Sequence, residues 1–386
     1  MSHSSLFKQD VRFLVQSQLY NKNHYALCYK EALVAFSNLR KRARMGHLSD
    51  LEAPFIQKSP PEKSLSHAKH ILIMGNKKDV GFLQPMIDCT QSWIPIQRAW
   101  PRTLFLDTID PRIFWEALSI CNPQETLIFF ISSSGDSPES VMPLMRCVEY
   151  WKNDLKALRN IATIIAPTKK GVLHTISEKF NLCHKEYIPS FLECRQYFSD
   201  TMLSIAEMSG FHAEKFKKGA ALTCTAFFRG SLSIPIEYTA LSLLARKEKD
   251  IMHYTCSSSL FDFERLTQWM HHNVSDPEPW IFQKSKPHDN GQRTFYTLFM
   301  ERNMTKEPLT PSIWQDNMLL LELSKNPLFC FVHKNHDGLC RKIINEGHFL
   351  RTLHVEKADE IALGALFMNH ILENLMMKEA FDVRSS

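Results

Sequence analysis

Hydroxyl groups that could hold an anion are concentrated in one short segment, residues 132–137, which reads Ser-Ser-Ser-Gly-Asp-Ser. The apolar run 127–131 before it predicts a buried strand. After it, Ser137, Pro138 and Glu139 are typical of the cap and first turn of a helix. The same helix is predicted to place these apolar residues on one face: Val141, Leu144, Met145, Val148 and Trp151.

The turn between that strand and that helix has the properties of an anion site. A helix N-terminus presents main-chain N–H groups and a partial positive charge, and serine adds hydroxyl donors. We therefore predict that a small phosphorylated sugar binds here through its phosphate, with Ser132, Ser134 and Ser137 as ligands. The alternative is an ordinary strand-to-helix turn that is rich in serine.

The segments around this turn predict the framework that positions it. From about residue 66, short apolar runs alternate with helical stretches, at 70–74, 81–89, 103–106, 111–120, 125–131, 138–152 and 161–166. Fully apolar strands that alternate with amphipathic helices are typical of a parallel sheet covered on both faces. The chain is therefore predicted to be an α/β protein whose first α/β domain spans 66–190.

The rest of the chain is divided into four further segments. Residues 1–65 are read as a helical, polar N-terminal segment, and 191–250 as linker helices. Residues 251–350 are read as a second, weaker α/β domain, with apolar runs at 280–282, 318–323 and 328–332. Residues 351–386 are predicted to carry a last helix, over 361–378.

Composition narrows the class of protein. The 386 residues are 44% hydrophobic and 23% charged, which is typical of a globular protein of two or three domains. A net charge of +5 suits small anionic ligands better than nucleic acid. The basic cluster at 40–44 could be a nucleic-acid arm, but its length favours a solvated helix face.

Two further features concern the compartment. No apolar run approaches the ~20 residues of a membrane span, and no signal peptide is read at the N-terminus, so no membrane partner is expected. The ten cysteines include no CxxC and no spacing with histidine that suits zinc. They predict reduced, buried thiols in a cytoplasmic protein.

Several motifs resemble known signatures. The pattern Ser-x-Ser-Gly-x-Ser-x-Glu at 132–139 is similar to that of the sugar-isomerase (SIS) domain, in which hydroxyl groups surround the phosphate of a phosphorylated sugar. In order with this loop, further blocks resemble the glucose-6-phosphate isomerase family in its shorter bacterial form. These blocks are 71–81, 104–111, 193–199, 291–298 and 363–382.

The resemblance implies a fold and an activity. The fold is two SIS-type domains with parallel sheets flanked by helices, plus N- and C-terminal helical segments. The activity is the aldose–ketose isomerisation of glucose 6-phosphate and fructose 6-phosphate in glycolysis and gluconeogenesis. The resemblance also implies a homodimer with its active site near the subunit boundary, and a reaction that needs neither metal nor cofactor.

The residues that the resemblance assigns to proton transfer depart from the family. The catalytic glutamate falls on Asn273, or on Asp276 if the gap is moved. Asparagine cannot accept a proton at neutral pH, and aspartate is one methylene shorter than glutamate. The ring-opening histidine falls on Arg293, which stays protonated, although His288 lies five residues earlier. The family's late lysine has no match, and Arg384 is offset from it.

The binding residues are closer to the family pattern. Arg195 matches the arginine that faces the enediolate, with a salt-bridged linker arginine as the alternative. The family's glycine-rich turn has become Asn76-Lys77-Lys78. In this turn Lys78 holds the position of a serine and is predicted to supply charge to the phosphate, with a solvated turn as the alternative.

Three hypotheses for function follow. The first is a diverged, slow glucose-6-phosphate isomerase that uses Asp276 or the pair 271–272 as its base. The second is a non-catalytic relative that binds a sugar phosphate as a sensor or a partner-binding subunit. The third, an SIS-type transcription regulator, ranks last because residues 1–60 show no convincing helix-turn-helix.

Overall fold

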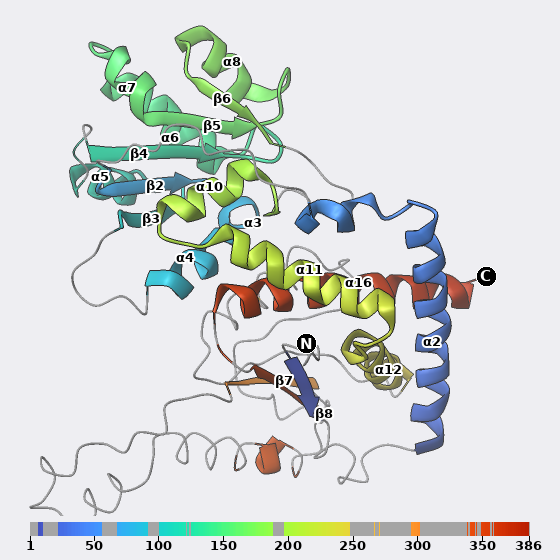
Figure 1. The fold of residues 1–386 in the computed structure, drawn as a ribbon. Coiled ribbons are helices and arrows are strands. Elements are labelled where there is room, and N and C mark those ends of the chain that lie inside the picture. Colours follow the sequence, from blue (N-terminus) through green and yellow to red (C-terminus); the bar gives the residue numbers. More distant parts are fainter. Residues whose placement is uncertain are drawn as a thin grey trace, which may run out of the picture. The chain divides into compact units, whose positions relative to one another are not determined.

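The apolar runs of the first half form a five-stranded parallel sheet in the computed structural model (Figure 1). The strands are β2 (His70–Met74), β3 (Arg102–Leu106), β4 (Thr126–Ile131), β5 (Ala162–Ala166) and β6 (Cys183–Glu186). Their order in the sheet is β3-β2-β4-β5-β6, and every neighbouring pair is parallel. This confirms the predicted α/β class, with a parallel sheet flanked by helices.

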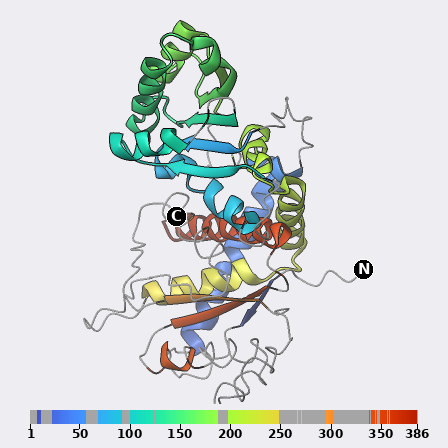
Figure 2. The ribbon, with the colours of Figure 1, turned by 90° about the vertical axis from the view of Figure 1, so that its left-hand side faces the viewer.

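Helices cover both faces of this sheet (Figures 1 and 2). They are α3 (Lys77–Val80), α4 (Leu83–Gln91), α5 (Pro111–Ile120), α6 (Pro138–Tyr150), α7 (Leu155–Ile161), α8 (Gly171–Phe180) and α10 (Asp200–Met208). One face of the sheet, which includes Leu72 and Met74, packs against α5, α6, α7 and α8. The alternate residues Ile71 and Ile73 are buried as well, as expected when strands are covered on both faces.

One predicted core position is wrong. Met145 falls on the apolar face of α6 by its spacing, but its side chain is 53% exposed. Leu144 and Trp151 of the same predicted face are buried. The apolar stripe of α6 is therefore narrower than the spacing suggests, because the sheet and its neighbouring helices cover only part of the helix surface.

A smaller sheet and long helices form a second region. The helices are α2 (Lys22–Arg44), α11 (Ala213–Arg229), α12 (Ile234–Lys247) and α16 (Glu360–Ser385), and the sheet has the order β1-β8-β7. Its strands are β1 (Phe7–Asp10), β7 (Phe295–Glu301) and β8 (Phe349–Val355). Strands β7 and β8 are parallel, and β1 is antiparallel to β8. Strand β1 corrects the prediction that residues 1–65 are helical, because a four-residue strand paired with a remote one has no local signal.

The chain divides into two units, one of Met1–His47 with Gly219–Ser386 and one of Leu48–Lys218. A 3₁₀ helix, η1 (Ser49–Phe55), lies near the start of the second of these. The five segments predicted from the sequence, and the boundaries between them, stay a prediction. The apolar runs 280–282, 318–323 and 328–332 lie outside the described residues.

The structure describes most but not all of the sequence. The described residues are 7–10, 22–55, 68–91, 100–120, 122, 125–187, 197–247, 266, 270, 295–301, 338, 340–343, 345, 349–355, 357 and 359–385. Within these ranges, no helix combines the length and the hydropathy needed to cross a bilayer.

Four of the described cysteines are buried, as the sequence predicts, and one is not. Cys28, Cys147, Cys224 and Cys340 are buried free thiols, and Cys183 is an exposed one. Burial raises the pKa of Cys224 to about 12 and raises that of Cys147 further. Both thiols therefore stay protonated and unreactive at neutral pH.

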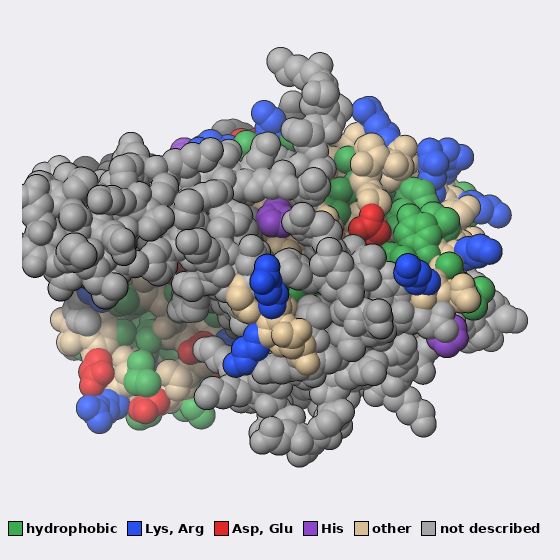
Figure 3. Space-filling view, turned by 90° about the horizontal axis from the view of Figure 1, so that it is seen from below, with side chains coloured by type: hydrophobic (Ala, Val, Ile, Leu, Met, Phe, Trp, Pro, Cys, Tyr) green, Lys and Arg blue, Asp and Glu red, His purple; other side chains and the backbone are tan. Residues whose placement is uncertain are grey.

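The basic cluster at 40–44 ends helix α2. Positive side chains are favourable there, because they face the negative end of the helix dipole. Arg42 also pairs with Glu379 of α16, with 2.7 Å between Nη1 and Oε2. In the view of Figure 3, Lys and Arg side chains at the right lie beside hydrophobic ones, and one at the lower left lies beside acidic ones.

Candidate functional site

The serine turn, residues 132–137, lies at the carboxyl edge of the five-stranded sheet, between β4 and α6. The chain runs from β2 to β3 on one side of β2, and then to β4 on the other side. The loops after β2 and β4 therefore diverge at the point where the strand order reverses. Open α/β sheets bind ligands in the crevice at such a switch point, so the topology selects the same turn as the residue pattern did.

Two glycines fix the shape of the serine turn against the start of α8. Gly135 has a φ of +82° and Gly171 one of +87°, which side chains rarely adopt. A Cβ on Gly171 would lie 2.9 Å from the carbonyl oxygen of Gly135. That carbonyl accepts the N–H of Leu173 at 3.0 Å, and Asp136 Oδ1 accepts the N–H of Val172 at 2.7 Å.

Ser132 holds the turn together through hydrogen bonds to its main chain. Its side chain is fully buried, and its Oγ accepts the main-chain N–H groups of Gly135 at 3.0 Å and of Ser137 at 3.4 Å. Its own N–H donates to the carbonyl of Ile165 in β5. In this conformation the hydroxyl of Ser132 closes the turn, and its predicted contact with phosphate stays a prediction.

Ser137 is also engaged within the protein. Ser140 Oγ donates to the carbonyl of Ile131 at 2.6 Å, so its own proton is used. Ser137 Oγ lies 3.0 Å from Ser140 Oγ and must be the donor in that contact. Ser137 is the N-cap residue of α6, as predicted, but its side chain makes no capping bond.

Ser134 differs from the other two serines because it is exposed. Its Oγ accepts the N–H of Asp136 at 3.2 Å and lies 3.3 Å from Ser132 Oγ. Among the described residues, no partner takes the main-chain N–H of Ser134 or that of Glu139 in the first turn of α6. These two N–H groups and the Ser134 hydroxyl are donors that a ligand could use.

The turn after β2 lies against the serine turn. A Cβ on Gly75 would lie 2.5 Å from the carbonyl oxygen of Ile131, so the two chain segments touch there. Asn76 caps the short helix α3 by accepting the N–H of Asp79 at 2.9 Å. The buried carboxylate of Asp79 in turn accepts the N–H of Ser133 at 3.0 Å.

This contact places both positive and negative charge beside the serine turn. The Asp79 carboxylate is buried and takes one N–H that an anion could otherwise use. Lys77 and Lys78 precede it in α3 and are exposed. An anion bound at this edge would therefore depend on the lysines to offset the aspartate.

The predicted catalytic residues have no described position. Asn273, Asp276, Arg293 and Arg195 lie outside the described residues, as does His288. Their predicted roles stay predictions.

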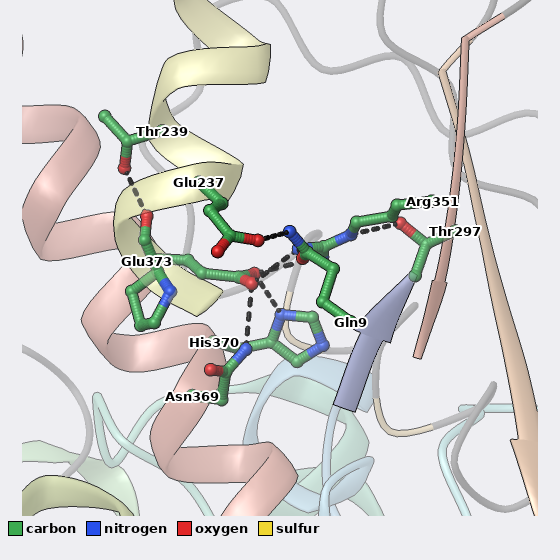
Figure 4. Close-up of polar contacts among 9 residues, drawn as sticks. Gln9, Glu237, Thr239, Thr297, Arg351, Asn369, His370 and Glu373 are labelled. Carbon is green, nitrogen blue, oxygen red and sulfur yellow. Dashed lines mark hydrogen bonds and ion pairs between the residues drawn. The ribbon is translucent and has the colours of Figure 1, made fainter. Parts of the chain in front are cut away.

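A buried polar cluster that the sequence analysis missed lies in the other unit (Figure 4). Arg351 of β8 and Glu373 of α16 form a two-pronged ion pair, with Nη1 to Oε1 at 2.7 Å and Nη2 to Oε2 at 3.2 Å. Asn369 Nδ2 donates to Oε1 at 2.8 Å, and His370 Nδ1 lies 3.0 Å from Oε2. We call these four residues the Arg351 cluster; all are buried.

The guanidinium of Arg351 reaches two other strands. Its Nε donates to Thr297 of β7 at 2.9 Å, and its Nη1 lies 3.4 Å from Gln9 Oε1 of β1. Gln9 then donates to Glu237 of α12 at 2.7 Å. The ring of Tyr238 lies 4.1 Å from Arg351 Cζ, which adds a cation–π contact.

The charge state of Glu373 follows from these contacts. Burial alone would raise the pKa of Glu373, but the charge of Arg351 and the hydrogen bond from His370 outweigh it and lower this pKa to about 2. The carboxylate is thus held ionised. The sequence offered a weak signal for this cluster, because Asn369, His370 and Glu373 interrupt an otherwise apolar helix.

The fold is similar to those of two solved structures, and this likeness rests on structure rather than on sequence. A hypothetical protein from Thermus thermophilus is similar to this chain with a TM-score of 0.67 and 16% identity, over 97% of this chain and 94% of that one. A glucose-6-phosphate isomerase from Chlamydia trachomatis is similar with a TM-score of 0.56 and 11% identity, over 86% and 73%. No protein-family profile matches the sequence, and no curated protein matches it.

Proposed function

We propose that this protein binds a small phosphorylated sugar, with the phosphate over the serine turn. The observation that carries the proposal is the set of donors at the switch point: the N–H groups of Ser134 and Glu139 and the exposed hydroxyl of Ser134. Backbone N–H groups at a helix N-terminus and serine hydroxyls suit a phosphate dianion. The similarity of the fold to a glucose-6-phosphate isomerase agrees with a ligand of this class.

Charge around the turn limits the strength of this binding. Asp79 repels an anion at short range, and Lys77 and Lys78 attract it. We propose that Lys78 contacts the phosphate, as its place in the sequence predicts. Sugar-phosphate binding should then weaken as salt is added. Salt screens the attraction between exposed charges, with a Debye length of ~8 Å at physiological ionic strength.

We further propose that isomerisation of glucose 6-phosphate and fructose 6-phosphate is impaired in this protein. Asn273 cannot act as a base, and Arg293 cannot cycle as an acid. Loss of one general base typically costs ~10²–10⁴ in rate. Asp276 is the candidate substitute base, and Arg195 the candidate for the enediolate. A non-catalytic sugar-phosphate-binding role is the second candidate, and a homodimer and a cytoplasmic location remain predictions.

The experiment is a thermal-shift titration of the full chain with glucose 6-phosphate, fructose 6-phosphate and unphosphorylated glucose. A ligand specific to the native state raises the melting temperature by mass action. We expect a shift with both phosphorylated sugars and none with glucose. A coupled assay of fructose 6-phosphate turnover on the same sample separates a slow isomerase from a protein that only binds.

Amino-acid substitutions test whether the shift in melting temperature arises from binding at the serine turn. Ser134→Ala together with Ser137→Ala should weaken the sugar-phosphate shift, and so should Lys78→Gln. The exposed Ser231, in the other unit, provides the control Ser231→Ala, which should titrate like the original protein. An unchanged titration of the double variant would contradict the assignment of the phosphate to this turn.

A further inference from the structure

Two histidine rings face each other behind the serine turn. His174 lies on α8 and His184 on β6, and their Nδ1 atoms are 3.4 Å apart. The ring centroids are 5.4 Å apart, and both side chains are partly buried. We call these residues the imidazole pair.

The outer nitrogen of each ring lies near an oxygen, as a hydrogen bond for His184 and as an ion-pair contact for His174. His184 Nε2 lies 3.0 Å from the main-chain carbonyl of Ala166, which can only accept. His174 Nε2 lies 3.4 Å from the carboxylate of Glu178, one turn further along α8. Both contacts favour a hydrogen on Nε2, which leaves a lone pair on each of the two Nδ1 atoms.

Ser177 adds a third lone pair to the same point. Its Oγ donates to the main-chain carbonyl of His174 at 2.7 Å, so its proton is used. The same Oγ lies 3.2 Å from His184 Nδ1 and turns a lone pair toward it. Three electron-rich atoms thus converge on one small volume, and a cation between them would remove their mutual repulsion.

We propose that His174 and His184 bind a divalent first-row transition-metal ion, such as Zn²⁺, through their Nδ1 atoms. Two nitrogens at ~2.0–2.1 Å from a tetrahedral Zn²⁺ lie about 3.4 Å apart, which is the separation found here. Ligating histidines usually donate their other N–H to a carbonyl or a carboxylate, and Ala166 and Glu178 provide one of each. Ser177 Oγ and water would complete the coordination.

This site has two protein nitrogens rather than the three or four ligands of a structural zinc site. Among the described residues, no group of three or more His, Cys, Asp and Glu side chains is arranged around a metal ion. Open positions therefore leave room for water, and the ion should exchange readily. Sequence reasoning missed this pair, because histidines ten residues apart on a helix and a strand match no metal motif.

A metal ion here would stabilise the segment of α8 that contacts the serine turn. It would link α8 to β6 through His174. The preceding residue, Leu173, donates its N–H to the carbonyl of Gly135 in the turn. Val172, one residue earlier, holds Asp136 of the turn. The ion would stabilise the packing of α8 on β6. This proposal stands whether or not a sugar phosphate binds.

The experiment is equilibrium dialysis of the full chain against chelator-buffered Zn²⁺. The chain has 17 histidines and ten cysteines, so differences between variants matter more than the total bound. We expect His174→Gln and His184→Gln each to bind one Zn²⁺ fewer per chain than the original protein. Glu178→Gln should keep the site but weaken it about tenfold, because it loses the support of one ligand.

The matched control is His212→Gln, since His212 is exposed and lies in the same unit. This variant should bind as much Zn²⁺ as the original protein. Circular dichroism tests the folding of each variant, and His174→Gln decides the outcome if His184→Gln does not fold. Equal Zn²⁺ binding by His174→Gln and the original protein would overturn the proposal and leave an ordinary hydrogen bond between the rings.

Discussion

The serine turn and the Arg351 cluster are both built from polar side chains, but their partners come from different distances along the chain. In the turn, the side-chain hydroxyls of Ser132, Ser137 and Ser140 bond to groups within nine residues of themselves. In the cluster, Arg351 reaches Gln9, which is 342 residues away, and Glu373, which is 22 away.

The difference separates two tasks. The hydroxyls of the turn use local bonds to fix its shape, and the main-chain N–H groups of Ser134 and Glu139 have no described partner. In the cluster, each carboxylate oxygen of Glu373 has two hydrogen-bond partners. The contacts of Arg351 and Gln9 then join β1, β7, β8, α12 and α16. A site that exchanges a ligand needs the first arrangement, whereas a buried charge needs the second.

The largest expected effect is on the cluster. Glu373→Gln would leave the Arg351 guanidinium buried without its counter-charge, which typically costs about 3–5 kcal/mol of stability. Denaturant unfolding should show this loss. The control is Glu116→Gln, which breaks an exposed ion pair with Arg112 and should change stability by less than about 1 kcal/mol. Equal losses of stability in the two variants would show that the buried ion pair contributes no more than the exposed one.

The pH dependence of stability should depend on the same carboxylate. The pKa of Glu373 is lowered from an ordinary 4.5 to about 2, so its contribution is fully present above pH 4.5 and is lost as the pH falls toward 2. By linkage this amounts to about 3 kcal/mol. Unfolding midpoints measured from pH 5 to pH 2 should fall more steeply for the original protein than for Glu373→Gln. Parallel curves would show that Glu373 is not held ionised.

A third prediction concerns the helix that carries the cluster. Gly219 of α11 touches the backbone of α16, where an added Cβ would lie 1.8 Å from the carbonyl oxygen of Ile361. Gly219→Ala should therefore destabilise the protein by about 1–3 kcal/mol, because one helix must move. The control is Gly338→Ala, where no described atom lies within 4 Å of an added Cβ and stability should be unchanged or slightly raised. Thermal unfolding compares the two, and a tolerated Gly219→Ala would contradict this close packing.

The smallest effects distinguish the serines of the turn. Ser132→Ala would leave two N–H groups without their acceptor and should cost about 1–3 kcal/mol. Ser134→Ala removes an exposed hydroxyl and should change stability by less than about 0.5 kcal/mol. Denaturant unfolding of the single variants without ligand gives both values. The reverse order would mean that Ser134, rather than Ser132, closes the turn.

Much of the five-stranded sheet could be predicted from sequence. The run 127–131 and the Ser137-Pro138 cap give β4 and the start of α6 to within a residue, because apolar periodicity and capping are local. Met145 was misplaced because spacing defines a helix face but not how much of it neighbours cover. Strand β1 was missed because its partner, β8, lies more than 300 residues away.

The candidate site was likewise only half predictable. The sequence pointed to the hydroxyl-rich turn through its residue types and to Lys78 through the family resemblance. It could not tell that Ser132 and Ser137 are engaged inside the protein and that Ser134 is exposed, because hydroxyl directions depend on bonds formed after folding.

By itself, then, the sequence determined the alternation of strands and helices and the position of the serine-rich turn, because each arises from neighbours in the chain. Only the tertiary structure decided which strand neighbours which, how Asp79 meets Ser133, and how Arg351 finds Glu373. Such contacts join residues whose separation along the chain carries no periodic signal, and burial fixes them once apolar surfaces have packed.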